Sequence, residues 1–247
     1  EASGSLGNYR GTDVIGKKGI EKTWEARLHG RTGLDEVEVN ASGRPLRTLR
    51  RIDPVPGEDV KLSIDLNLQR VAEAAFGDNR GALVALDPKT GEVLAFVSQP
   101  SFDPNLFVNG IDVDNWRALS ESPDRPLINR PLSGTYPIGS TYKPFMALAG
   151  LEYGVRSASD VIHDPGFFEL AGHRFRNAGS VAYGATNMHK SLVVSSDTYY
   201  YSLASELGVN RIHDFMKPFG FGQITGIDLE GEKAGVLPST DWKARNY

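Results

Sequence analysis

The amino-acid sequence predicts an α+β fold with an extended arm at its N-terminal side. Two short apolar runs, at residues 81–87 and 92–99, flank a turn, and most of the helical patterns come after residue 140. A hairpin followed by helices implies an α+β or mixed sheet-and-helix domain. The 247 residues, of which 40% are hydrophobic and 23% charged, have the composition of a globular protein.

Residues 1–57 are predicted to form the arm or pedestal, because they are polar, rich in glycine and arginine, and unable to bury much of a core. One helical stretch is expected near residues 20–28. The alternation in Glu36–Asn40 predicts a strand with one buried face, followed by a turn at 41–44. Two prolines and a glycine at 54–57 mark the boundary, so residues 58–247 form the second predicted domain.

The second domain begins with a helix that Asp65 is expected to cap, with Leu68, Val71, Ala72 and Ala75 on one face. The turn at 87–91 joins the two apolar runs into a β-hairpin, because its proline presets a backbone angle and its glycine accepts positive φ. A loop-rich region at 100–134 follows. The remaining helices are expected at 142–153, 188–194, 198–207 and 211–219.

Charge and composition exclude several classes of protein and site. The 27 lysines and arginines against 31 acidic residues leave a net charge of −4, which argues against nucleic-acid binding. Cysteine is absent, so the nucleophile of any covalent mechanism is an oxygen or an amine. No run of about 18 apolar residues occurs, so no transmembrane helix is expected. Because the sequence begins at Glu1 and ends at Tyr247 without a start or stop pattern, we expect it to be a fragment.

Ser140 and Lys143 are the first candidates for chemistry. Pro137 and Gly139 form a turn, Ser140 opens a helix, and the three-residue spacing places Lys143 on the same face. A lysine desolvated enough to be neutral can take the proton of a serine and make it nucleophilic. The spacing alone is weak evidence, and the alternative interpretation is a capping serine followed by a solvated lysine.

A second group of polar residues, Ser195-Ser196-Asp197, separates an apolar run from the helix that follows. If this segment lies beside the Ser140–Lys143 pair, Ser195 relays a proton and Asp197 holds the relay and the lysine in place. The alternative is an ordinary helix cap made by a serine or by the aspartate.

Together these features resemble the monofunctional class B penicillin-binding transpeptidases. The resemblance covers nearly the whole chain, and its segments occur in one order. Asp197, where many members carry asparagine, is associated with the enzymes of cell elongation rather than division. The matching segments are 16–21, 29–33, 36–40, 87–95, 100–105, 129–131 and 136–145.

The resemblance implies a fold shared with the serine β-lactamases, an antiparallel sheet flanked by helices, with a pedestal arm before it and the C-terminal part of the domain missing. It also implies acyl transfer on peptidoglycan stem peptides without a cofactor. Ser140 attacks the carbonyl between the two terminal D-alanines, with Lys143 as its base, Ser195 as proton relay and Asp197 as orienting group. β-Lactam antibiotics acylate the same serine.

The third motif of the family is Lys-Ser/Thr-Gly, and Lys89-Thr90-Gly91 matches it in letters. We reject this match, because the motif follows the other two in the family whereas Lys89 precedes Ser140 and lies in a predicted turn. The true third motif is expected beyond Tyr247, together with the strand amide that completes an oxyanion hole.

No metal site is predicted. The histidines at 163, 173, 189 and 213 lack metal-ligand spacing. Some members of the family have a cluster of acidic, histidine and cysteine ligands between the first two motifs. Here Asp164 is kept, Asn177 and Tyr183 stand near the other ligand positions, and cysteine is absent. We also expect Tyr199–Tyr201 to pack in a core rather than to form a stacking surface.

The expected partners are stem peptides, β-lactams, a membrane glycosyltransferase and the proteins of the elongation complex, with no nucleic acid. The resemblance places the protein in the inner membrane, with its single-pass anchor outside this chain and its catalytic domain in the periplasm. Two alternatives stay open: a serine β-lactamase, against which the long arm argues, and a β-lactam sensor or non-catalytic scaffold.

Overall fold

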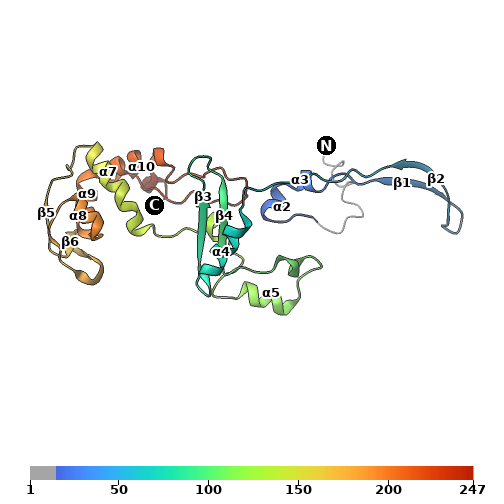
Figure 1. The fold of residues 1–247 in the computed structure, drawn as a ribbon, viewed down its shortest axis with the longest axis horizontal. Coiled ribbons are helices and arrows are strands. Elements are labelled where there is room, and N and C mark those ends of the chain that lie inside the picture. Colours follow the sequence, from blue (N-terminus) through green and yellow to red (C-terminus); the bar gives the residue numbers. More distant parts are fainter. Residues whose placement is uncertain (1–14, 247) are drawn as a thin grey trace. The chain divides into compact units, whose positions relative to one another are not determined.

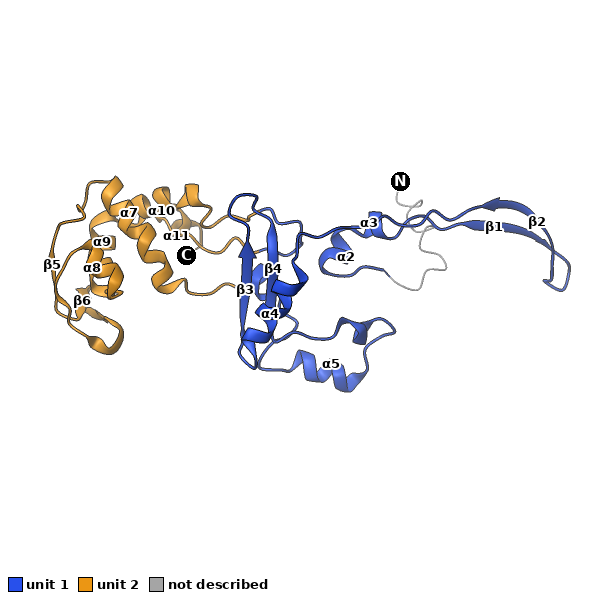
Figure 2. Cartoon of the chain, in the orientation of Figure 1, with its two compact units in different colours: residues 1–134, 226–232 blue, residues 135–225, 233–247 orange. Residues whose placement is uncertain are grey.

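The structure is a computed structural model and describes residues 15–246. It contains two compact units (Figure 2). Unit 1 contains the residues up to Gly134 together with Gly226–Glu232, and unit 2 contains Thr135–Thr225 and the residues from Lys233 onward. The units divide after residue 134, whereas the sequence predicts a domain boundary after residue 57, and that boundary stays a prediction.

The arm in unit 1 consists of two short helices and a hairpin (Figure 1). Helices α2 (Gly19–Thr23) and α3 (Glu25–Leu28) replace the single predicted helical stretch, because the backbone departs from helical angles at Trp24. Strands β1 (Leu34–Val39) and β2 (Pro45–Ile52) pair antiparallel through a turn closed by the Asn40 side chain. The predicted buried face of β1 is wrong: all its residues are exposed except Glu38, which is half-buried, because among residues 15–246 the strand packs mainly against β2.

The rest of unit 1 is built around the predicted second hairpin. Strands β3 (Gly81–Leu86) and β4 (Val93–Gln99) are antiparallel, and helix α4 (Leu66–Phe76) packs on them. The predicted cap is confirmed, since Asp65 accepts hydrogen bonds from the first-turn amides of α4. The predicted apolar face is only partly correct: Ala72 is buried against the sheet, whereas Val71 is 67% exposed.

The region predicted as loop-rich also contains short helices. They are η1 (Pro104–Phe107), α5 (Val113–Ser120) and α6 (Arg130–Ser133). Asp112 caps α5, and the buried Arg130 donates hydrogen bonds to backbone carbonyls of the preceding loop. Side-chain hydrogen bonds to backbone therefore order a segment that lacks apolar periodicity.

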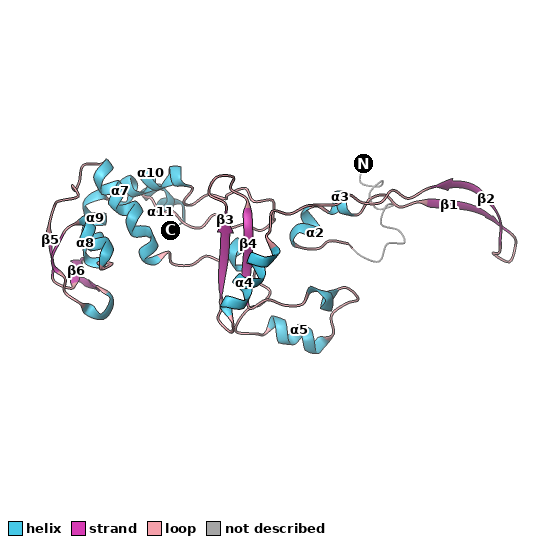
Figure 3. Ribbon diagram, in the orientation of Figure 1, coloured by secondary structure: helices cyan, strands magenta, loops and turns pink. Residues whose placement is uncertain are grey.

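Unit 2 contains the predicted helices, and in addition η3, α11 and four short strands that the sequence did not predict, of which β5 and β6 are labelled in Figure 3. The helices are η2 (Gly139–Tyr142), α7 (Lys143–Glu152), η3 (Ala178–Ser180), α8 (Met188–Val193), α9 (Asp197–Leu207), α10 (Val209–Met216), η4 (Lys217–Phe219) and α11 (Thr240–Asn246). The strands are β5 (Ile162–Asp164), β6 (Phe167–Leu170), β7 (His173–Arg176) and β8 (Gly184–Thr186). They pair as β5–β8 and β6–β7, both antiparallel. Over residues 15–246 every sheet has two strands, so α+β describes the chain, while one larger sheet flanked by helices stays a prediction.

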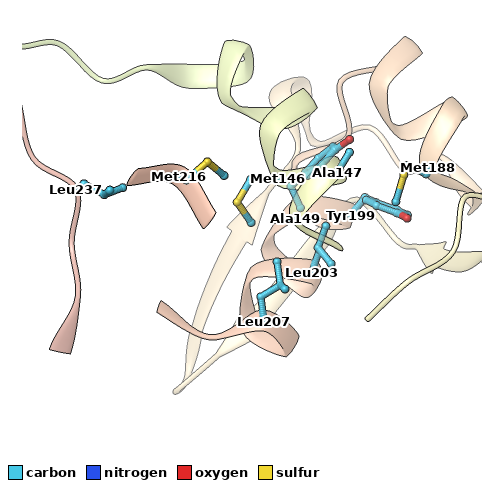
Figure 4. Close-up of a cluster of buried hydrophobic side chains, with 10 residues drawn as sticks. Met146, Ala147, Ala149, Met188, Tyr199, Leu203, Leu207, Met216 and Leu237 are labelled. Carbon is cyan, nitrogen blue, oxygen red and sulfur yellow. The ribbon is translucent and has the colours of Figure 1, made fainter. Parts of the chain in front are cut away.

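The core of unit 2 lies where α7, α8, α9 and α10 meet (Figure 4). Helices α7 and α9 approach closely at Gly150, where an added methyl carbon would lie 3.1 Å from Leu203 Cδ1. Tyr199 and Tyr200 are buried as expected, while Tyr201 is 39% exposed. The buried cluster is Met146, Ala147, Ala149, Met188, Tyr199, Tyr200, Leu203, Leu207, Met216 and Leu237. This packing fixes the first turn of α7 against the first turn of α9. In the described part of the chain, no helix has the length and apolarity needed to cross a membrane.

Candidate active site

Ser140 lies in η2, the single 3-10 turn that leads directly into α7. Gly139 before it has a φ of +63°, a left-handed conformation that glycine adopts readily. Pro144 follows in the first turn of α7, where its missing N–H costs no helical hydrogen bond. Ser140 itself is exposed, so its hydroxyl is accessible to a substrate.

Lys143 begins α7 and is buried, with 7% of the residue exposed. Its Nζ donates to the carbonyl oxygen of Ser195 at 2.7 Å, to Ser195 Oγ at 3.0 Å and to Asp197 Oδ1 at 2.6 Å. These three acceptors match the three N–H groups of an ammonium. A buried charge requires such pairing, so the alternative of a solvated lysine after a capping serine is wrong.

Ser195 connects the lysine to Ser140, since its Oγ also hydrogen-bonds Ser140 Oγ at 2.9 Å. The path therefore runs from Asp197 through Lys143 and Ser195 to Ser140. The Ser140–Lys143 spacing suggests a direct pair, but the structure inserts Ser195 between the two side chains. Ser195 has a φ of +55°, which is uncommon for a residue with a Cβ and costs conformational energy.

The 195–197 segment contains both a helix cap and two residues beside Lys143, and the relay and orienting roles of those two residues stay predictions. Ser196 is the helix cap, because its Oγ accepts from the backbone N–H of Tyr199 at 3.1 Å. Ser195 and Asp197, on either side of it, both contact Lys143 Nζ. Asp197 lies in the first turn of α9, where the helix dipole stabilises its negative charge.

Behind this segment lies a buried carboxylate, Asp164, which is 0% exposed and accepts a hydrogen bond from Ser196 Oγ at 2.6 Å. Burial by itself raises the pKa of Asp164, but hydrogen bonds from Ser196, Asn177 and the Gly166 N–H outweigh it and hold the pKa below its ordinary value. The sequence singled out Asp164 and Asn177 only as remnants of a metal cluster. Their contact with the second motif was missed, and no sequence pattern signals it.

The other candidates contribute no further site. Lys89-Thr90-Gly91 forms the predicted turn, in which Asp87 Oδ1 accepts from the N–H groups of Lys89 and Thr90 at 2.7 and 3.2 Å. Gly91 has the positive φ that this turn requires. Across residues 15–246, no group of three or more histidine, cysteine or acidic side chains is arranged to hold a metal ion. The absence of a zinc site stays a prediction.

Comparison with protein families gives two matches along the chain. The family described as "Penicillin binding protein transpeptidase domain" matches residues 81–247, and the "Penicillin-binding Protein dimerisation domain" matches residues 2–62. The chain is similar to the peptidoglycan D,D-transpeptidase MrdA of Acinetobacter baumannii, with 48% identity over 239 residues. This match covers 96% of the chain and 36% of the relative, so the chain spans little more than a third of that protein.

Solved structures show the same similarity. PBP2 of Pseudomonas aeruginosa, in complex with WCK 5153, superposes with a TM-score of 0.81 at 45% identity. The match covers 96% of this chain and 50% of that one. PBP2 of Helicobacter pylori, in a complex with MreC, superposes with a TM-score of 0.86 at 32% identity, covering 98% of this chain and 45% of that one.

Proposed function

The chain belongs to the penicillin-binding transpeptidase family, and we propose that the protein containing it is a peptidoglycan D,D-transpeptidase of the penicillin-binding protein 2 type. It cross-links stem peptides during cell elongation and is a target of β-lactams. The observation that carries the proposal is the continuous hydrogen-bond path from Asp197 through Lys143 and Ser195 to the exposed hydroxyl of Ser140.

In the acylation step, Ser140 Oγ attacks the carbonyl carbon of the penultimate D-alanine of a stem peptide. Lys143 acts as a base only in its neutral form, so its ammonium first releases one proton to solvent. Rotation of the two serine hydroxyls then reverses the hydrogen-bond path, and the proton of Ser140 passes through Ser195 to Lys143. The bond to the terminal D-alanine breaks, and its nitrogen takes the proton back from Lys143 through Ser195. An ester to Ser140 and free D-alanine are the products.

The second step reverses the first with a different amine. An amino group of a neighbouring stem peptide attacks the ester carbonyl and gives one proton through Ser195 to Lys143. A new amide bond forms, the bond between the acyl carbon and Ser140 Oγ breaks, and Ser140 Oγ takes that proton back through Ser195. Asp197 orients Lys143 during both steps, since its carboxylate is 2.6 Å from Nζ. The side chains on the path are already in contact, so little rearrangement precedes proton transfer.

We further propose that the remainder of the protein completes the transpeptidase domain and anchors it to the membrane. The rest of the sheet and the third motif come from residues beyond 247, and an anchor outside this chain holds the protein in the inner membrane. The catalytic domain lies in the periplasm, where its stem-peptide substrates are. A membrane glycosyltransferase that supplies new glycan strands is a partner.

The hairpin of the arm is the proposed contact for proteins of the elongation complex. Large apolar side chains are exposed along both of its strands, an arrangement that marks an interaction surface. The structure of the H. pylori relative, to which 98% of this chain aligns, is a complex with MreC. The exposed side chains are Leu34, Val37, Val39, Leu46, Leu49 and Ile52, each at least 43% exposed.

The test of the function is covalent labelling of the full-length protein with a fluorescent penicillin, followed by peptide mass spectrometry. We expect the label on Ser140 and no labelling of Ser140→Ala. Ser101→Ala is the matched control, because Ser101 is also an exposed serine but lies outside the hydrogen-bond path, and it should label as the wild type does.

Label on another residue, or undiminished labelling of Ser140→Ala, would refute the proposal. Rapid release of hydrolysed penicillin would identify a serine β-lactamase instead. Stable acylation without cross-linking of stem peptides would identify a sensor or scaffold.

A further inference from the structure

We propose that Asp164 and Asn177 are positioning residues of the active site, which hold the segment 195–197 in the geometry that connects Lys143 to Ser140. The proposal rests on the function proposed above. Neither residue contacts the reacting hydroxyl, so both act through the residues beside Ser195 and Asp197.

The backbone of this segment needs support. Ser195 adopts a φ of +55°, which its Cβ disfavours, and it does so between helices α8 and α9. Its carbonyl oxygen and its Oγ both contact Lys143 Nζ, at 2.7 and 3.0 Å. A relaxation of this φ would move both acceptors, so the lysine contacts depend on a conformation that the residue does not favour by itself.

Asp164 supports the segment at Ser196. The hydroxyl of Ser196 donates to Asp164 Oδ2 at 2.6 Å, and both residues are 0% exposed. Asp164 in turn accepts from the Gly166 N–H at 2.8 Å and from Asn177 Nδ2, which is 3.0 Å from each carboxylate oxygen. A hydrogen bond to a buried, fully partnered carboxylate is strong and directional. Ser196 is therefore fixed between the two residues that contact Lys143.

Asn177 supports the segment on the other side, at Thr198. Its Oδ1 accepts from the backbone N–H of Thr198 at 2.8 Å and from Thr198 Oγ1 at 2.9 Å. Its Nδ2 donates to Asp164 and to the Val181 carbonyl at 2.8 Å. Asn177 and Thr198 are each 3% exposed. The amide oxygen of Asn177 thus binds the first turn of α9, and its amide nitrogen binds Asp164.

The two residues are brought together by the strands between the first and second motifs. Asp164 ends β5, and Asn177 follows directly after β7. The polar network touches residues 196 and 198, whereas the apolar cluster of unit 2 holds α9 through Tyr199 and Leu203. The apolar core therefore fixes the position of α9. The Asp164–Asn177 pair fixes the backbone conformation of the residues that lead into the first turn of α9.

The test measures acylation of the full-length protein by a chromogenic β-lactam across a range of concentrations. This separates the dissociation constant of the first complex from the acylation rate constant. In Asp164→Asn, the new amide N–H₂ meets the N–H₂ of Asn177, and the carboxylate that accepts from Ser196 is lost. We expect the rate constant to fall about 100-fold, the effect of a misplacement of about 1 Å. The dissociation constant and the melting temperature should change little.

The matched control is Asp160→Asn. Asp160 is an exposed aspartate that also accepts hydrogen bonds from a serine, at 2.7 Å from Ser157 N and Ser157 Oγ. It should acylate at the wild-type rate. The exchange Asp164→Asn with Asn177→Asp restores one donor–acceptor pair between the two side chains. The double variant should recover part of the acylation rate constant. Such a recovery would not be expected if Asp164→Asn acted only by lowering the stability of the protein.

An acylation rate constant within twofold of the wild type in folded Asp164→Asn would overturn the proposal. If that variant does not fold, Thr198→Val decides. It removes the hydroxyl, which hydrogen-bonds Asn177 and also interacts with Asp164, and it keeps the backbone bond to Asn177. A fall of about 3- to 10-fold supports the proposal, as expected for one hydrogen bond, and an unchanged rate overturns it. Failure of the wild-type protein to acylate at Ser140 would instead refute the proposed function.

Discussion

The β1–β2 hairpin and the 195–197 segment use similar ion pairs in opposite surroundings. In the hairpin, Arg51 and Asp35 form a bidentate pair at 2.8 and 2.7 Å, with 64% and 45% of their side chains exposed. In the site, Lys143 and Asp197 form a pair at 2.6 Å, with 9% and 26% exposed. Water screens the first pair and competes with it, whereas burial shields the second pair from water.

The apolar side chains of the two regions differ in the same way. Leu49 in β2 is 53% exposed, and Leu203 in α9 is 0% exposed. In the arm both charged and apolar groups face solvent, which suits a surface that meets another protein. At the site and in the core of unit 2, Lys143 and Leu203 are buried and partnered, which suits a site that must keep its geometry through a reaction. Burial, rather than residue type, therefore decides what each contact contributes.

The largest effect is expected for Lys143→Met, which keeps much of the side-chain volume and removes the charge. Ser195 then loses its connection to a base, and Asp197 loses its cation. We expect the second-order acylation rate of the full-length protein to fall at least about 100-fold, the lower range for loss of a general base. Penicillin binding followed over time measures this rate.

Lys89→Met is the matched control, because Lys89 is exposed in the turn between β3 and β4. It should change the free energy of unfolding by less than about 0.5 kcal/mol and leave acylation unchanged. A collapse of acylation in the Lys89 variant, with stability intact, would show that Lys89-Thr90-Gly91 belongs to the active site after all.

The next largest effect is expected on the free energy of unfolding, when a leucine is replaced by alanine in each of the two regions. Leu203→Ala leaves a cavity between α7 and α9 and should reduce the free energy of unfolding by about 2–5 kcal/mol. Leu49→Ala in the arm should reduce it by less than about 0.5 kcal/mol. Denaturant unfolding of both variants measures the difference. Equal losses would mean that the hairpin is covered in the full-length protein and that its exposure here is not a property of the arm.

The smallest effect is expected for Arg51→Met. The hydrogen bond from Arg51 holds the pKa of Asp35 below its ordinary value, and partial desolvation opposes this. Because the folded pKa is lowered, the pair contributes stability above the ordinary carboxyl pKa, and that contribution is lost as the pH falls through the lowered value. Carboxyl-carbon NMR should show the pKa of Asp35 rising in the variant. An unchanged pKa would mean that the pair is not formed in solution.

Local signals in the sequence predicted those parts of the fold that local interactions determine. The Asp65 cap, the Asp87 turn and helices α7 and α9 each follow from a capping residue, a turn residue or apolar periodicity within a few positions. Strands β5 to β8 were missed, because three or four residues are too short to show a period. The exposure of β1 was missed as well, since alternation indicates two faces but not what covers them.

Contacts in the site join residues that lie far apart in the sequence, and local sequence signals did not predict these contacts. The sequence singled out Ser140, Lys143, Ser195 and Asp197, but family resemblance brought them together, since 52 residues separate Lys143 from Ser195. Their roles stay predictions. The Asp164 to Ser196 bond joins residues 32 positions apart, and the φ of Ser195 depends on such contacts. Neither periodicity nor a local motif encodes these relations, so only the folded chain reveals them.

The most direct test of the proposed transpeptidase is a cross-linking reaction with the full-length protein and glycan strands that carry pentapeptide stems. Free D-alanine and cross-linked dimers are measured together. We predict one D-alanine released for each cross-link formed, with both products absent in Ser140→Ala. Cross-links formed by Ser140→Ala at the wild-type rate, or D-alanine released by the wild type without cross-links, would contradict it.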